Sequence, residues 1–282
     1  MMNTVQANNP FTNAVAISAD EFKWMQQYLY RNTGIVLSDS KQSLVSGRLD
    51  KRLRFYGFNS YTEYFHLLGK PGHEQETVMA IDLLTTNETY FFREHQHFNF
   101  LKDQVFKRYA PGKSLRIWSA ASSSGEEAYS LAMLLAEHAP TQQWEVLGTD
   151  ISERILEKAR SGLYPLQAAE KIPKPLLKKY CLKGVGEYDG FLLIDQALRK
   201  RVRFLHLNLN ESWQDIGRFD VIFLRNVMIY FDTPTKQRLI DRMPRYLHPG
   251  GFLIISHAES LTNLRTELKM FAPSIYQKSL HV

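Results

Sequence analysis

The sequence predicts an α/β fold, in which a doubly wound sheet follows an all-helical N-terminal domain and carries a small antiparallel β-insertion. Three observations predict it. Helical periodicity fills residues 18–84. Further along, short apolar runs alternate with helical patterns, as in sheets that are covered on both faces. At residues 115–135, one such run leads through a turn of small residues into a helix.

The composition fits a protein with a buried core. The chain has 282 residues, 44% of them hydrophobic, and a net charge of +6. That excess suggests an acidic partner, although mild excesses are usually solvated surface. A single cysteine, Cys181, excludes an internal disulfide framework. No apolar run approaches the ~20 residues that span a bilayer, and the polar N-terminus does not resemble a secretory signal. We therefore expect a cytoplasmic protein without membrane insertion.

The N-terminal part is expected to form a flexible tail, residues 1–17, and a helical domain, residues 18–84. Ser18 and Glu21 form a plausible capping box at the start of the first helix. Apolar positions at helical spacing continue the pattern. The helices are expected at residues 18–34, 39–56, 60–69 and 73–84.

The second predicted helix carries a basic face. Lys41, Arg48, Lys51 and Arg52 fall together on it, because positions three and four apart are neighbours on a helix. From composition alone, a solvated face is the simpler interpretation and a docking face for an acidic partner is the alternative. The helical domain has no catalytic constellation of its own.

Residues 85–98 (TTNETYFFREHQHF) are expected to connect the two domains. Here polar Asn87 and Thr89 stand beside three consecutive aromatic residues, and Arg93 follows them. We expect the aromatic side chains to pack in the core and the polar ones to face a ligand. The two histidines at the end of the segment are two positions apart, which matches no known zinc-ligand spacing, so no metal site is expected.

The strand, turn and helix at residues 115–135 form the unit that holds a nucleotide-like ligand in sheets of this kind. The turn has one glycine, Gly125, where a dinucleotide site has three, so a pyrophosphate grip is not indicated. Glu126 and Glu127 stand where a phosphate-binding turn presents its amides. This pair favours a cationic or uncharged ligand such as S-adenosylmethionine. An ordinary strand, turn and helix without a ligand is the alternative.

The later strands end in polar residues. Asp150, Asn208 and Arg225 all follow predicted strand ends, and in an open α/β sheet these ends form the ligand-binding edge. Asp150 is placed to bind ribose hydroxyls, or else to cap the next helix. The strands are expected at residues 144–148, 203–209, 219–224, 252–256 after a Pro-Gly-Gly turn and, antiparallel, 274–278.

Four motifs, in order, resemble those of the bacterial chemotaxis receptor methyltransferases (CheR). They are LTTNETYFFRE (84–94), WSAASSSGEEAYSLA (118–132), TDIS with ILEKARSGLY (149–164) and FLRNVMIYFD (223–232). The resemblance covers nearly the whole chain and implies a Rossmann-like class I methyltransferase domain at residues 99–282. It implies methyl transfer from S-adenosylmethionine to glutamate side chains on the cytoplasmic helices of membrane chemoreceptors, in sensory adaptation. S-adenosylhomocysteine would be the second product.

The resemblance also implies site residues. Those matching cofactor contacts are Asn87, Thr89, Arg93, Glu127, Asp150, Asn208, Leu209, Leu224 and Arg225. Arg93 and Tyr230 match the pair beside the reacting groups, and the matched receptor-docking residues are Arg48, Lys51, Arg52 and Arg54. The insertion, at about 180–204, resembles a β-subdomain that in some members binds a peptide at the receptor C-terminus. Its turn glycines match at Gly184, Gly186 and Gly190, but Leu193 stands where such members can carry arginine.

The implied chemistry needs no general base, because a glutamate with a pKa of about 4.3 is already ionised at neutral pH. The enzyme supplies alignment, worth about 7–11 kcal/mol in a near-attack geometry. We expect Arg93 to orient a carboxylate with its planar fork, and the Tyr230 hydroxyl to position the reacting groups. Methyl transfer to a nucleic acid or small molecule and a non-catalytic cofactor-binding scaffold are the alternatives. The expected partners exclude nucleic acid and metal, and the enzyme is expected to be recruited to receptor arrays.

Overall fold

The computed structural model describes residues 15–108, 114–139 and 143–280. The chain divides into two compact units, Met1–Asn32 with Val36–Thr85 and Thr33–Ile35 with Thr86–Val282. The predicted flexible tail, residues 1–17, lies mostly outside the described residues. Across these ranges, no helix has the length and apolar character needed to cross a membrane.

The first unit is all-helical over its described residues, as predicted. The expected capping box is present, because the Ser18 amide donates to the Glu21 carboxylate at 2.9 Å and the Glu21 amide donates to Ser18 Oγ at 3.3 Å. Met25, Leu29 and Leu49 are fully buried. The helices are α1 (Ala19–Thr33), α2 (Gln42–Tyr56), α3 (Tyr61–Leu68) and α4 (Glu74–Leu84), with a 3₁₀ turn, η1 (Asp39–Lys41), before α2.

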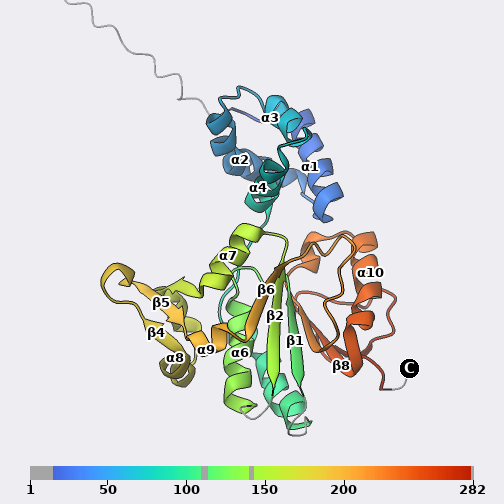
Figure 1. Cartoon of the computed structure of the whole chain (residues 1–282). Helices are drawn as coiled ribbons and strands as arrows, with labels where there is room; N and C mark the ends of the chain where they lie inside the picture. Colours follow the sequence, from blue (N-terminus) through green and yellow to red (C-terminus); the bar gives the residue numbers. More distant parts are fainter. Residues whose placement is uncertain (1–14, 109–113, 140–142, 281–282) are drawn as a thin grey trace, which may run out of the picture. The chain divides into compact units, whose positions relative to one another are not determined.

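The second unit is built on a seven-stranded sheet in the order β6-β2-β1-β7-β8-β10-β9 (Figure 1). The first five strands in this order run parallel, and β10 and β9 follow antiparallel. This confirms the predicted doubly wound sheet and its antiparallel closure. The strands are β1 (Leu115–Ala120), β2 (Trp144–Asp150), β6 (Val202–His206), β7 (Phe219–Leu224), β8 (Leu247–Ile255), β9 (Lys269–Ala272) and β10 (Ile275–Gln277).

Helices cover both faces of this sheet. In β1, Ile117 belongs to one apolar core with α6, whereas the adjacent Trp118 belongs to a second core with α10. Both side chains are fully buried, as expected of a central parallel strand. The helices and turns are α5 (His95–Phe100), η2 (Leu101–Val105), η3 (Phe106–Arg108), α6 (Glu126–His138), α7 (Glu153–Ser161), η4 (Leu166–Lys171), α8 (Lys174–Tyr180), η5 (Gly186–Tyr188), α9 (Gln196–Arg199), η6 (Met228–Tyr230), α10 (Thr233–Arg242) and η7 (Met243–Tyr246).

The antiparallel insertion is present, but its extent differs from the predicted 180–204. It is a separate sheet in the order β3-β5-β4, made of β3 (Leu163–Pro165), β4 (Cys181–Lys183) and β5 (Phe191–Ile194). β3 has three residues, one of them proline, and follows α7 with no alternating pattern, so no local pattern predicts a strand there. At the other end, β6 already belongs to the main sheet from its first residue.

Gly184, between β4 and β5, has a steric role. A Cβ atom at this position would lie 1.9 Å from the Tyr188 carbonyl oxygen. Any other residue would therefore push the β4–β5 hairpin open.

One other strand prediction was wrong in extent, and one strand was not predicted. The expected Pro-Gly-Gly turn before residue 252 lies inside β8, where the pairing with β7 shifts register. Close packing explains this, since a Cβ on Gly251 would lie 3.0 Å from the Asp220 carbonyl oxygen. β9 was not predicted, because its outer edge is unpaired and its residues show no alternation of apolar and polar side chains.

Candidate functional site

The carboxyl end of β1 lies between β2 and β7, the point where the strand order reverses. Open α/β sheets bind ligands at such a switch point. The turn that follows reaches α6 through Gly125, whose φ is +93°. A Cβ here would lie 2.9 Å from the Ala159 Cβ. Gly125 therefore permits both the left-handed backbone and the close packing of this turn.

Backbone strain gathers around this switch point. Six described non-glycine residues have a positive φ, and five of them lie in the segments 92–94, 121–123 and 226. Such conformations cost about 1–3 kcal/mol each, and they cluster at functional sites. These residues are Phe92, Glu94, Ala121, Ser123 and Asn226.

Ser123 joins two of the predicted cofactor residues. Its amide donates to Asp150 Oδ2 at 2.9 Å, and its hydroxyl donates to the Asn87 carbonyl oxygen at 3.1 Å. Asp150 Oδ1 accepts from the Ser152 amide at 3.0 Å. Ser152 itself caps α7, with Oγ accepting from the Ile155 amide. Ser152, and not Asp150, is therefore the N-cap of α7. Asp150 instead fixes the turn after β1.

Arg225 is the centre of a buried ion-pair network. Its side chain is 1% exposed, and Nη1 lies 3.0 Å from Glu127 Oε2. Nη2 lies 3.3 Å from Glu94 Oε2 and donates to the Arg93 carbonyl oxygen at 2.5 Å. Ser119 Oγ donates to Glu127 Oε1 at 2.6 Å. We call Arg225, Glu94 and Glu127 the arginine hub; it joins the end of β7, the segment before α5 and the start of α6.

The hub sets two carboxyl groups, Glu94 and Glu127, against one guanidinium. Burial raises the pKa of Glu127, while Arg225 and the Ser119 hydroxyl oppose that rise. Burial also acts on Glu94, but Arg225 and hydrogen bonds from Ser256 and the His257 amide outweigh it and lower its pKa. Glu94 therefore stays ionised at neutral pH. Together with Asp150, the hub makes the switch point favourable for a cation.

Glu126 contributes less than the sequence suggested. It is buried and accepts from the Ser124 hydroxyl at 2.7 Å. Burial raises the pKa of this carboxyl group. The predicted acidic pair is thus divided: Glu127 belongs to the hub, and Glu126 is held within the turn.

The two residues predicted to act on the reacting groups lie in different surroundings. Arg93 Nη1 donates to the Glu88 carbonyl oxygen at 2.9 Å, and its guanidinium lies 5.6 Å from the Tyr90 ring centroid. Tyr230 closes η6 and is half-buried. Among the described residues, its hydroxyl has no hydrogen-bond partner, and neither a hydrogen bond nor a cation–π contact joins Tyr230 to Arg93. Both side chains therefore keep polar groups available for a ligand.

The remaining predicted cofactor residues differ in exposure. Leu209 and Leu224 are 7% and 0% exposed and belong to one apolar core. Asn208 lies beyond β6, where Nδ2 donates to Glu211 Oε1 and Oδ1 accepts from the Asn210 amide. Thr89 is half-buried. These positions stay predictions as ligand contacts.

The predicted docking residues on α2 fall into two groups. Arg48 donates to the carbonyl oxygens of Leu83 and Thr85, at the end of α4. Arg52 forms two hydrogen bonds with the carboxylate of Glu76, which is 5% exposed. Lys51 is exposed, and Arg54, 53% exposed, pairs with Asp50 on the same helix. Lys51 and Arg54 are therefore the two that present a charge to solvent.

One group of described residues has the composition of a metal site. Ligand atoms of Glu94, His97 and His257 lie within 4.8 Å of one another. Burial lowers the pKa of His97 to about 3, and the positive charge of Arg225 adds to this effect. The Glu94 oxygen that faces His97 is the same one that Arg225 approaches. A guanidinium thus already supplies positive charge here, and the sequence-based expectation of no metal stays a prediction.

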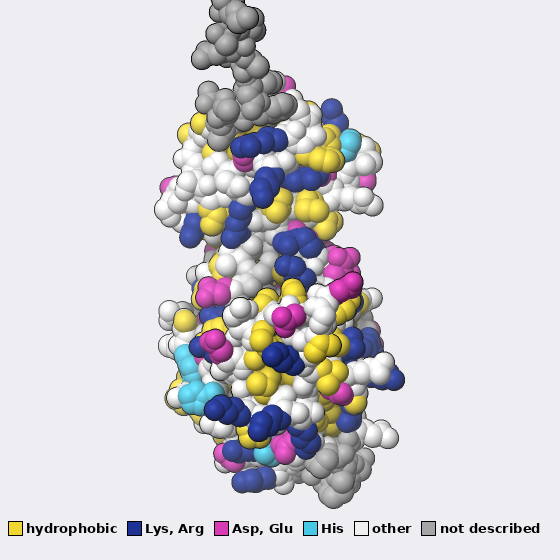
Figure 2. Space-filling view, turned by 90° about the vertical axis from the view of Figure 1, so that its left-hand side faces the viewer, with side chains coloured by type: hydrophobic (Ala, Val, Ile, Leu, Met, Phe, Trp, Pro, Cys, Tyr) yellow, Lys and Arg dark blue, Asp and Glu magenta, His cyan; other side chains and the backbone are white. Residues whose placement is uncertain are grey.

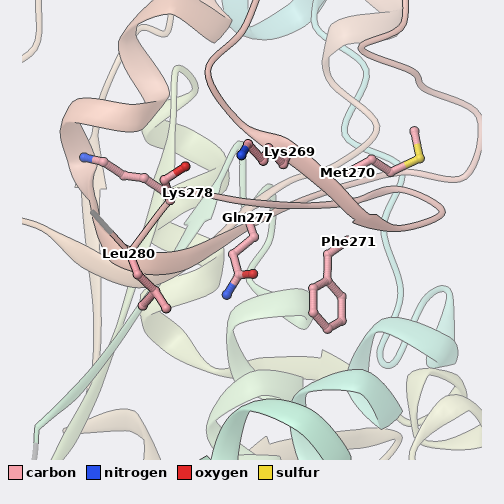
Figure 3. A pocket seen from close by; sticks show the side chains of 7 residues that line it. Lys269, Met270, Phe271, Gln277, Lys278 and Leu280 are labelled. Carbon is pink, nitrogen blue, oxygen red and sulfur yellow. The ribbon is translucent and has the colours of Figure 1, made fainter. Parts of the chain in front are cut away.

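A pocket of about 310 Å³ lies along β9 and β10, the last two strands in the sheet order (Figure 3). Figure 3 shows Phe271 and Gln277 extending to the same side of this hairpin. None of the predicted site residues lines this pocket. It is separate from the switch point.

Two family models together match most of the chain. Residues 20–85 match the model described as "CheR methyltransferase, all-alpha domain", and residues 87–276 match "CheR methyltransferase, SAM binding domain". The chain belongs to the CheR methyltransferase family. This confirms the resemblance identified in the sequence, and it confirms S-adenosylmethionine as the cofactor of this CheR domain.

Curated relatives of this CheR chain carry the same kind of name. Chemotaxis protein methyltransferase 2 of Pseudomonas aeruginosa is 40% identical, over 91% of this chain and 92% of that protein. The chemotaxis protein methyltransferase of Escherichia coli is 38% identical, over 95% of this chain and 94% of that protein. That of Borreliella burgdorferi is 36% identical, over 99% of this chain and all of that protein.

The residues at the switch point fit S-adenosylmethionine. The sulfonium is a cation, and the hub with Asp150 leaves negative charge at this edge. Arg225 Nε is buried and has no hydrogen-bond partner among the described residues, so the hub retains one polar group for a ligand or water. In this CheR protein, the acidic residues Asp150 and Glu127 stay predictions as cofactor contacts.

Sequence reasoning missed Ser123 and Glu94. Ser123 is one of three consecutive serines, and no pattern distinguishes the one that bridges Asn87 and Asp150. Glu94 directly follows Arg93 in the motif LTTNETYFFRE, so a charged residue at this place was visible. Its partner Arg225 lies 131 positions later, and only the fold pairs the two.

Asp150→Asn is expected to weaken S-adenosylhomocysteine binding about 10- to 100-fold, equivalent to the ~1.5–3 kcal/mol of a hydrogen bond to a charged group. The Ser123 and Ser152 amides bind different oxygens of Asp150; asparagine replaces one of these oxygens with an NH₂ group that cannot accept, so the turn after β1 loses one anchor. Isothermal titration calorimetry measures the effect. Asp189→Asn, an exposed carboxylate in the β4–β5 hairpin, is the matched control. An Asp150→Asn affinity equal to that of the control would contradict the assignment.

Proposed function

We propose that this protein methylates glutamate side chains of membrane chemoreceptors, forming glutamate methyl esters with S-adenosylmethionine as the methyl donor. The observation that carries the proposal is the match to both CheR domains over residues 20–85 and 87–276. The relatives that align over almost all of this chain are named chemotaxis protein methyltransferases. Recruitment to receptor arrays would follow from the choice of substrate.

The site supports a transfer that depends on alignment. When bound, S-adenosylmethionine supplies an electrophilic methyl group on a cationic sulfur. The glutamate oxygen forms the new C–O bond as the C–S bond breaks, and the bonding pair stays on sulfur. Arg93 orients a carboxylate through two parallel N–H donors, and the Tyr230 hydroxyl positions the reacting groups. Because the nucleophile is already ionised, no residue needs to remove a proton.

A methyl-transfer assay tests the proposed function. The protein is incubated with radiolabelled S-adenosylmethionine and receptor-bearing membranes, and the products are treated with alkali. Glutamate methyl esters release volatile labelled methanol. Alkali-stable label, or label carried on RNA, would instead favour the alternative methyltransferase functions. Absence of transfer to several receptors would favour a non-catalytic scaffold.

Docking of the receptor is proposed on the exposed basic part of α2. Figure 2 faces the side on which α2 lies in Figure 1, and it shows Lys and Arg side chains beside apolar ones over the N-terminal unit. Lys51 and Arg54 are exposed on α2, and Phe55 next to them is 69% exposed. Helices that present glutamate substrates are acidic, so the charges are complementary.

Lys51→Glu is expected to raise the KM for receptor about tenfold, because it places like charges opposite each other, and high salt should reduce the effect. The unfolding free energy should change by less than about 0.5 kcal/mol. Arg52→Ala is the matched contrast: it should lower stability by about 2 kcal/mol, because the buried Glu76 loses a charged partner. An unchanged KM for Lys51→Glu at low salt would argue against docking through α2.

The stabilisation by Arg52 depends on pH. Burial alone would raise the pKa of Glu76, but hydrogen bonds from Arg52, Tyr64 and Tyr56 outweigh it, and the pKa is lowered. A lowered folded-state pKa stabilises the fold above the unfolded value of about 4.3, and the contribution is lost as pH falls. The difference between wild type and Arg52→Ala should therefore be smaller at pH 4 than at pH 7.

Binding of a receptor C-terminal peptide to the β3-β5-β4 sheet is a further part of the proposal. β4 is an edge strand of this sheet, and an open edge can accept an added strand. Leu182, Val185 and Tyr188 are each more than half exposed beside it. Fluorescence anisotropy with a labelled receptor C-terminal peptide tests this, and Leu182→Asp should abolish the signal.

A further inference from the structure

The segment after β7 carries two residues on which the site depends. It starts with Arg225, the centre of the hub, and ends with Tyr230 in η6. Between them, Asn226 has a φ of +58°, a left-handed conformation that is uncommon outside glycine, although asparagine adopts it more often than most residues. A strained segment keeps one shape only when its surroundings fix it. The contacts that fix this one come from Glu259, beyond the end of β8.

Glu259 binds the segment through its backbone amides. Oε2 accepts from the Asn226 amide at 3.1 Å and from the Ser256 amide at 2.9 Å. Oε1 accepts from the Ile229 amide at 3.3 Å. The Asn226 side chain adds a hydrogen bond from Nδ2 to Ser256 Oγ at 2.8 Å. Both carboxylate oxygens therefore hold the chain on either side of the turn.

The charge of Glu259 is neutralised by backbone dipoles. Within the described residues, no lysine, arginine or histidine forms an ion pair with it. Burial raises the pKa of this carboxyl group, and the backbone hydrogen bonds oppose the rise. Glu259 is half-buried, and a partly desolvated carboxylate without a cation is costly, so the amides that it binds are its main compensation. The carboxylate and the turn thus stabilise each other.

We propose that Glu259 is a positioning residue for methyl transfer: it fixes the turn of residues 226–229 and through it places Tyr230 for the reacting groups. The inference rests on the proposed function, because the part of Tyr230 is itself proposed. Glutamine cannot replace Glu259, since one of its terminal atoms is an NH₂ group that would face backbone N–H donors. Aspartate is one methylene shorter and cannot reach both sides of the turn.

The test compares Glu259→Gln with Glu267→Gln, which changes an exposed carboxylate in the same β8–β9 connection. For Glu259→Gln we expect kcat to fall about 10- to 100-fold, the cost of a misplacement of about 1 Å. The affinity for S-adenosylhomocysteine should stay within about twofold, because the turn after β1 is intact. Amide hydrogen exchange at Asn226 and Ile229 should become faster. Glu267→Gln should leave all three unchanged.

A double-mutant cycle with Tyr230→Phe tests whether Glu259 acts through Tyr230. If it does, the double variant is about as slow as the slower single variant, since coupled residues do not add. If the reduction of kcat in the double variant equalled the product of the two single reductions, the proposal would be overturned. An unchanged kcat in Glu259→Gln, or unchanged exchange at Asn226 and Ile229, would also overturn it. If Glu259→Gln does not fold, Glu259→Asp is measured in the same way.

The exchange measurement separates this inference from the proposed function. The exchange measurement needs neither receptor nor methyl transfer. If the wild-type protein did not methylate receptors, the proposed function would be wrong, but hydrogen exchange in the turn of residues 226–229 could still be measured. Faster exchange in Glu259→Gln would then support the fixing of the turn, and unchanged exchange would overturn it.

Discussion

Replacing Arg225 with alanine is expected to lower the free energy of unfolding by about 3–5 kcal/mol, the cost of breaking a buried ion pair from one side. The change leaves Glu94 and Glu127 close together without the guanidinium that they share. It also removes the donor to the Arg93 carbonyl oxygen at 2.5 Å. Urea unfolding followed by fluorescence measures the loss. Arg245→Ala, which removes an exposed arginine in η7, is the control and should change stability by less than about 0.5 kcal/mol.

The destabilisation by Arg225→Ala should depend on pH in a defined direction. Without Arg225, the effect of burial on Glu94 and Glu127 is opposed less strongly, so the pKa values of both carboxyl groups rise. A folded-state pKa above the unfolded value stabilises the protonated protein, and this contribution is lost as pH rises through the folded pKa. The variant should therefore lose less stability at pH 5 than at pH 8. An equal loss at both values would show that missing packing, and not charge, is the cause.

Arg93→Ala is expected to reduce kcat about 10²- to 10³-fold, the range for losing one donor that stabilises charge in a transition state. The arginine hub should survive, because it uses the Arg93 carbonyl oxygen and not its side chain. Stability should therefore change little, which separates this variant from Arg225→Ala. Initial-rate kinetics with receptor membranes and calorimetry with S-adenosylhomocysteine measure the two effects.

Arg93→Lys is the informative second variant. Lysine keeps the charge but lacks the planar fork that binds a carboxylate through two parallel hydrogen bonds. An intermediate kcat is expected if orientation of a carboxylate is the role. Full turnover of Arg93→Ala with normal cofactor binding would show that the assignment is wrong.

The main architecture was predictable because it depends on local patterns. An apolar run such as FDVIFL, at residues 219–224, can be buried on both faces, and the polar residues that follow such runs mark the ligand-binding edge. β3 and β9 were not predictable, because they have only three and four residues. β3 also depends on pairing with β5, about 30 positions later, and β9 is an edge strand that pairs only with β10. The shifted register of β8 arises from backbone contacts of Gly251, which leave no hydrophobic signal.

The sequence predicted where in the sheet the site lies. It did not predict most of the hydrogen bonds and ion pairs among the site residues. Asp150 was assigned from its place after a strand, and Glu127 was distinguished from Glu126 only by the resemblance to the CheR motif. The role of Arg225 changed most: expected as part of a cofactor wall, it is the buried centre of an ion-pair network. Ser123 and Glu259 act mainly through backbone amides and carbonyls, which every residue type has. A sequence pattern cannot specify such contacts.

The arginine hub has a consequence for how this family can change over time. Glu94, Glu127 and Arg225 come from three separate segments, and each is poorly tolerated once its partners are gone. A lineage that loses one member first passes through a destabilised intermediate, so substitutions at these positions are expected to occur together or not at all. In a large set of related sequences, substitutions at these three positions should therefore be correlated. Glu126, which lies beside them and outside the network, should vary independently of them.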